Sequence, residues 1–225
     1  MKKLLALLLA AVMLLSVLSA CSSSADAPAD TQPAETETTE PAAEETTEET
    51  KEEEPAAEEP SQEELDQAAA DEVAAMIDAI YVQTRTDETD AQCEAAKAAW
   101  DALTDEQKAL VEGEEASPDY FGLDTGDASK DDPRNQDEIG ENELLVVSFG
   151  TSFNDSRVAD IKGIEDALQE ANPDWSVRRA FTAQIIINHI QARDGEKIDN
   201  MDQALERAVA NGVKNLVVQP THLMH

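Results

Sequence analysis

The last third of the chain most constrains the fold, because apolar runs and amphipathic stretches alternate there. Residues 144–149 read Leu-Leu-Val-Val-Ser-Phe, and two further runs of this kind lie at 175–181 and 216–219. A nearly continuous apolar run is typical of a parallel strand that is covered on both faces. The pattern therefore predicts three strands within residues 142–225.

Helical patterns fill the intervals between these strands. One ends before Pro173, and two more end at Gly195 and at Asn211-Gly212. A glycine just after a helix accepts the left-handed conformation that ends it. Strands alternating with helices of this length indicate an α/β fold with a parallel sheet and right-handed crossovers. Arg178 and Arg179 alternate across the second strand, so at most one of them faces a cleft, and we expect a solvated charge.

Upstream, residues 63–113 predict a small helical module. Two apolar stripes have helical spacing, and they comprise Val73, Met76, Ile77 and Ile80, then Cys93, Ala96, Trp100 and Leu103. Thr104 and Gln107 form a capping-box pattern that opens a third, short helix. The phrase at 95–111 resembles small helical modules of Gram-positive surface proteins, which implies a spacer or interaction role.

The N-terminus has the pattern of a targeting segment. Lys2 and Lys3 precede an apolar run at 4–18, and Leu18-Ser19-Ala20-Cys21 is typical of a bacterial lipobox. The pattern predicts a signal peptide at 1–20 and lipid attachment at Cys21. The protein would then be exported and anchored in the membrane at the outer face of the cell. The alternative is an ordinary signal peptide with an incidental cysteine.

Acidic segments separate these parts. Residues 21–62 predict a disordered tether, because this Glu, Thr, Ala and Pro-rich stretch holds too few apolar side chains to offset the entropy of ordering. Residues 114–141 predict a second acidic linker. The net charge of the chain is −34, whereas residues 142–225 hold 12 acidic and 8 basic residues, a net of −4. Such an acidic chain argues against a nucleic acid partner.

Four phrases in the last third carry a family resemblance. They stand at 145–152, 177–182, 193–195 and 218–222, and together they resemble the anaerobic sirohydrochlorin cobaltochelatase family of cobalamin biosynthesis. The resemblance covers the N-terminal part of the family's domain. It implies a class II chelatase-like α/β fold, incomplete at the C-terminus, with a tetrapyrrole in a cleft and Co²⁺ as the metal that is inserted. The resemblance also implies haem as a ligand, since some exported relatives bind haem through a His in this region.

The same resemblance assigns no catalytic residue to this sequence. The family's base and its metal ligands, two His and a Glu, lie beyond His225, so we expect this chain to be inactive alone. It implies tetrapyrrole-binding candidates at the strand ends, namely Ser148, Gly150, Thr151, Ser152 and His222. His222 is also a weak candidate for a metal ligand, and His189 is expected on the surface.

Several alternatives stay open. The loop at 148–152 is either an anion-binding loop or one made tight by sterics alone, and His222 is either a ligand or a residue bonded beside the strand end. A second function is a surface-tethered lipoprotein that binds a tetrapyrrole, haem or a divalent metal without inserting it. A third is a structural surface protein. A homo-oligomer is compatible with each.

Overall fold

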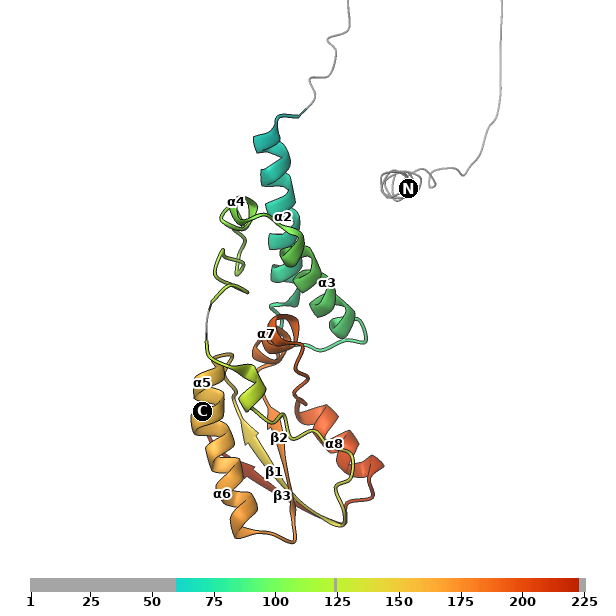
Figure 1. Cartoon of the computed structure of the whole chain (residues 1–225). Helices are drawn as coiled ribbons and strands as arrows, with labels where there is room; N and C mark the ends of the chain where they lie inside the picture. Colours follow the sequence, from blue (N-terminus) through green and yellow to red (C-terminus); the bar gives the residue numbers. More distant parts are fainter. Residues whose placement is uncertain (1–59, 124, 223–225) are drawn as a thin grey trace, which may run out of the picture. The chain divides into compact units, whose positions relative to one another are not determined.

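The computed structural model describes residues 60–222 except residue 124 (Figure 1). All of these residues fall within one unit of the chain, residues 56–225. The predicted signal peptide, Cys21, nearly all of the predicted tether and His225 lie outside the described residues. Element labels follow Figure 1 and begin at α2.

A three-stranded parallel sheet forms the centre of the α/β part. Strand β1 (Asn142–Ser148) lies between β2 (Ser176–Phe181) and β3 (Asn215–Pro220). Both neighbours pair with β1 in parallel, so Val147 faces Ala180 on one side and Pro220 on the other. The predicted α/β fold with three parallel strands is confirmed.

Helices cover the two faces of the sheet (Figure 1). On one face lie α5 (Asn154–Ser156), a π-helical segment (Arg157–Lys162) and α6 (Gly163–Ala171). On the other lies α8 (Met201–Ala210). Alternate residues of β1 divide between these faces: Leu144 and Val146 pack with Val177 and Leu168, whereas Leu145 and Val147 pack with Ala180 and Ala204.

The helical segment packs against helix α7 (Gln184–Asp194), which follows β2. The helical segment comprises α2 (Gln62–Ile80), α3 (Thr89–Ala102) and α4 (Asp105–Lys108). Its hydrophobic core includes Ala192 of α7. The Asn188 amide donates to the Ile80 carbonyl at 2.9 Å, and the Gln191 amide donates to Asp90 at 2.8 Å. Both bonds fix the segment to the α/β part.

Local caps explain where these helices begin. The predicted capping box of Thr104 and Gln107 is present at the start of α4. A second box, which the sequence reading overlooked, joins Ser61 and Glu64 at the start of α2. Cys93 of α3 is fully buried against α7, as expected of a small apolar residue. Burial raises the pKa of its thiol to about 11.

Part of the predicted acidic linker lies along the outer edge of β2. We call residues 125–141 the strap; it contains one 3₁₀ turn, η1 (Ala128–Lys130). The backbone N–H of Arg179 donates to the Arg134 carbonyl at 3.4 Å, and the Arg134 guanidinium donates to the Val177 carbonyl at 3.3 Å. Ser176 donates its hydroxyl hydrogen to the carbonyl of Ile139, which is buried. The strap therefore covers an edge that would otherwise be open.

The expectation that His189 lies on the surface is wrong. Its ring stacks on Tyr120 with 4.2 Å between centroids, and its Nε2 lies 2.8 Å from the Tyr120 carbonyl oxygen. A carbonyl only accepts, so Nε2 carries the hydrogen. Burial, helped by the charge of Arg193, lowers the pKa of His189 to about 4. The partners of His189, residues 120–121, lie far away in sequence, so the local pattern did not indicate its burial.

This burial predicts a pH dependence of stability. The folded-state pKa of His189 lies below its ordinary value of 6.5, so its contribution is present above pH 6.5 and is lost as the pH falls toward 4. The free energy of unfolding should fall by up to ~3 kcal/mol over this window. Urea denaturation at pH 7 and at pH 4 measures this fall. The His189→Phe variant should lose this part of the pH dependence, and an unchanged dependence would contradict the assignment.

Candidate functional site

The carboxyl ends of the three strands meet at one edge of the sheet. The backbone N–H of Thr182 donates to the Ser148 carbonyl at 2.9 Å, and that of Thr221 donates to the Val147 carbonyl at 2.9 Å. The β1–α5 loop, residues 149–153, therefore begins between the ends of β2 and β3. Ligands of open α/β sheets bind at this edge. We call it the rim.

The rim brings together the residues that the resemblance implied. Ser148 ends β1, while Gly150, Thr151 and Ser152 lie in the loop that follows it. His222 follows β3, and its ring lies 6.4 Å from that of Phe149, in an edge-to-face arrangement. That these residues bind a ligand stays a prediction.

Gly150 allows the loop to pass close over β2. Its φ is +101°, which disfavours residues with a side chain, and a Cβ there would lie 2.5 Å from the Phe181 ring. Steric demand thus explains this glycine without a ligand. The Thr151 hydroxyl is also engaged within the loop, where it accepts from the backbone N–H of Phe153 at 3.2 Å.

Two polar atoms at the rim have no partner. Within the described residues, Ser148 Oγ and His222 Nδ1 are buried and make no hydrogen bond. A buried polar atom without a partner costs roughly 1–3 kcal/mol, so such atoms are uncommon and require an explanation. A bound ligand with a polar group would supply one.

Two aromatic side chains at the rim are exposed and were overlooked in the sequence. Phe149 is 39% exposed and Phe153 is 52% exposed, and they flank the small residues of the loop. Large aromatic side chains are ordinarily buried. An aromatic residue within a loop of Gly, Ser and Thr at a strand end is the signal that could have identified them. They offer apolar surface to a flat ligand.

Below the rim, β2 carries two fully buried arginines, Arg178 and Arg179. The expectation of a solvated charge at this pair is therefore wrong. The side chain of Arg178 lies on the α8 face of the sheet. It donates to Glu143 of β1 at 2.7 and 2.9 Å and to the Ala204 carbonyl at 2.6 Å. Burial raises the pKa of Glu143, although Arg178 opposes the shift.

Arg179 lies on the opposite face and binds two carboxylates. It donates twice to Glu165 of α6, both at 2.8 Å, and twice to Asp131 of the strap, at 2.7 and 2.9 Å. Asp131 also accepts from Arg157 at 2.6 Å. Burial favours a raised pKa for Asp131, but Arg179 and Arg157 outweigh it and hold the pKa below its ordinary value.

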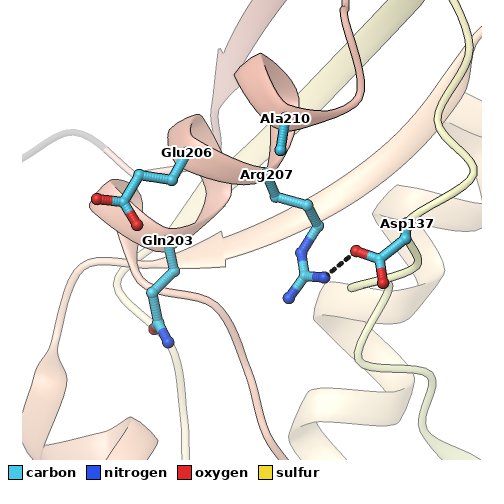
Figure 2. Close-up of a pocket in the computed structure, with 5 residues that line it drawn as sticks. All are labelled: Asp137, Gln203, Glu206, Arg207 and Ala210. Atoms are coloured by element: carbon cyan, nitrogen blue, oxygen red, sulfur yellow. Dashed lines mark hydrogen bonds and ion pairs between the residues drawn. The ribbon is translucent and has the colours of Figure 1, made fainter. Parts of the chain in front are cut away.

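Several pockets of the described residues lie beside α8 rather than at Gly150 or His222. A shallow one of about 350 Å³ is lined by Asp137, Gln203, Glu206, Arg207 and Ala210 (Figure 2). Arg207 binds Asp137 there and also binds Asp199, at 2.8 and 3.0 Å, so its charge is compensated. A second one of about 180 Å³ includes Thr182 at the end of β2 and Gln83 from the loop after α2. The first pocket has no uncompensated cation for an anionic ligand, and the second borders the rim at Thr182.

The described residues hold no metal centre and no membrane span. No three His, Cys, Asp or Glu side chains within residues 60–222 are grouped as metal ligands. Among the helices described there, none is long and apolar enough to cross a bilayer. His222 as a metal ligand therefore remains a prediction.

The fold and the rim define an α/β domain with its candidate ligand site at the carboxyl edge of a parallel sheet. Residues 142–225 match the family described as "Cobalt chelatase (CbiK)". The sirohydrochlorin cobaltochelatase of Salmonella typhimurium is 40% identical over 82 residues, which cover 36% of this chain and 31% of that protein. A search of solved structures found no match.

These findings show that the α/β segment, residues 142–225, is similar to the cobalt chelatase family. The predicted resemblance is confirmed for this segment. The chain spans about a third of the length of the curated relative that it matches. The residues upstream of 142 are outside the match.

The burial of Arg179 on β2 predicts a large loss of stability when its side chain is truncated. Arg179→Met leaves Glu165 and Asp131 with fewer partners in a buried position, so the free energy of unfolding should fall by about 3–5 kcal/mol. Lys214→Met is the control, because its pair with Glu141 is exposed and should contribute less than about 1 kcal/mol. Urea denaturation compares them. Equal losses of stability in the two variants would show that the ion pairs of Arg179 do not stabilise the fold more than an exposed pair does.

Proposed function

We propose that this chain carries the tetrapyrrole-binding first part of a sirohydrochlorin cobaltochelatase. The observation that carries the proposal is the family match of residues 142–225, whose three strand ends form the rim. Sirohydrochlorin is a tetrapyrrole with acidic side groups. In the proposed activity, Co²⁺ replaces the two pyrrole N–H protons of this ligand.

The rim suits such a ligand physically. Phe149 and Phe153 present apolar surface to the flat macrocycle, and aromatic faces stack favourably. The unpartnered Ser148 Oγ can donate to a carboxylate, and His222 Nδ1 can accept from or donate to a polar group. The chain therefore offers both kinds of contact at one edge.

Binding should depend on these side chains. With the full chain we expect uroporphyrin, a carboxylated probe, to bind with a Kd that rises about tenfold in Phe153→Ala and in His222→Ala. Porphyrin absorbance and fluorescence measure it. Val209→Ala is the control, because Val209 is 81% exposed on α8. Equal affinity in all four proteins would place the ligand elsewhere.

Metal insertion should require more than this chain. The described residues hold no grouped metal ligands, and the match covers 31% of the relative. We therefore expect no insertion of Co²⁺ into sirohydrochlorin above the rate without protein, followed by the change in absorbance. The Salmonella typhimurium relative serves as the positive control. Clear turnover by this chain would refute the proposal that its catalytic groups lie elsewhere.

We also propose that the chain is exported and lipid-anchored, which rests on the lipobox pattern at 18–21. In a bacterial host, labelled palmitate should enter the protein, and Cys21→Ala should abolish this labelling. Cys93→Ala is the matched control, because Cys93 is buried. Labelling that survives Cys21→Ala would rule out the anchor.

This export pattern favours a second function, a surface-tethered binder of a tetrapyrrole or haem that does not insert metal. Sirohydrochlorin arises in the cytosol, whereas the motif at Cys21 predicts a place outside. Haemin is the discriminating probe. Tight binding of haemin together with no binding of metal-free uroporphyrin would support this function over the first.

A further inference from the structure

The β1–α5 loop of the rim is held from below by two guanidinium groups. Its outward side chains, Phe149 and Phe153, are exposed, whereas the carbonyls of Thr151 and Ser152 accept from arginines. These arginines come from two different helical segments, Arg157 from the π-helical segment and Arg193 from the last turn of α7.

Arg193 makes the shorter contacts. Its Nη2 donates to the Ser152 carbonyl at 2.7 Å and to Asn154 Oδ1 at 3.2 Å, so it joins the loop to the first residue of α5. Two bonds to Asp194, at 2.8 and 2.6 Å, fix the guanidinium plane. In the Arg193-Asp194-Gly195 phrase, Asp194 therefore orients Arg193 toward the loop, a contact that the sequence did not indicate.

Arg157 supports the same loop from a fully buried position. It donates to the Thr151 carbonyl at 3.5 Å, a weak contact, while Asp131 and Glu196 hold it at 2.6 and 2.8 Å. Asp131 belongs to the strap and also binds Arg179. The loop is therefore connected through charged bonds to the strap, to α7 and to the buried Arg179 of β2.

We propose that Arg193, assisted by Arg157, is a positioning residue that fixes the β1–α5 loop so that Phe149 and Phe153 stay presented to the ligand. The proposal rests on the proposed tetrapyrrole site. Arg193 touches no ligand in this account. It acts through the Ser152 carbonyl, and a preorganised loop saves the ordering cost of binding.

The experiment compares the full chain with Arg193→Met, Arg193→Lys and a control, Arg207→Met. Arg207 also bridges carboxylates from a helix, but it belongs to α8, and its bonds go to Asp199 and Asp137 rather than to the β1–α5 loop. Two quantities are measured: amide hydrogen exchange of residues 149–153, and the Kd for uroporphyrin. Arg157→Met would remove one partner of the buried Asp131 carboxylate and the partner of the half-buried Glu196, which risks unfolding.

We expect Arg193→Met to speed exchange in the loop about tenfold and to weaken binding about tenfold, while exchange in the strands is unchanged. Arg193→Lys should restore part of both, since it keeps a charged donor, and Arg207→Met should alter neither. Unchanged loop exchange in Arg193→Met would overturn the proposal, as would a loosened loop with unchanged affinity. If the unmutated chain does not bind uroporphyrin, the proposed function fails, and exchange alone still decides whether Arg193 fixes the loop.

Discussion

The structure depends on a pair of adjacent arginines on β2 that point to opposite faces of the sheet. Arg178 ties β2 to Glu143 of the central strand and to α8, while Arg179 ties it to α6 and the strap. All four charged partners nearest to them, Glu143, Glu165, Asp131 and Asp199, are buried or have buried carboxylates. Burying such ions is tolerable only when every partner is in place. The two arginines therefore select one arrangement of helices around β2.

The two outer strands of the sheet differ in how far they are covered. The outer edge of β2 is covered by the strap, which Arg179 and Arg134 hold. Strand β3 is exposed over its whole length, with Leu216, Val217 and Val218 between 37 and 47% exposed. An apolar edge strand is ordinarily covered.

Much of the α/β fold could be predicted because its signals are local. The apolar runs of the strands, the glycine after α7 and the Asn200 cap of α8 each act within a few residues. Contacts that depend on distant partners could not be predicted in this way. Arg178 reads as a solvated charge until Glu143 pairs with it, and Arg179 does so until Glu165 and Asp131 pair with it. His189 reads as a surface residue until Tyr120 stacks on it.

The candidate site shows the same division. The small residues after β1 and His222 after β3 were predicted from phrases at the strand ends, and parallel pairing brings those ends together. Phe149 and Phe153 were overlooked because apolar residues near a strand end read as core. The support from Arg157 and Arg193 was hidden as well, since it is made through backbone carbonyls, which no side-chain pattern records.

The central claim is that a tetrapyrrole binds at the rim of this sheet. The most direct measurement is a backbone amide NMR titration of the full chain with uroporphyrin, with the resonances assigned. Binding at the rim should give the largest shifts at residues 148–153 and 221–222, with small changes in α8 and in the helical segment. Shifts concentrated at Arg207 and its neighbours on α8, or around α2 and α3, would contradict it.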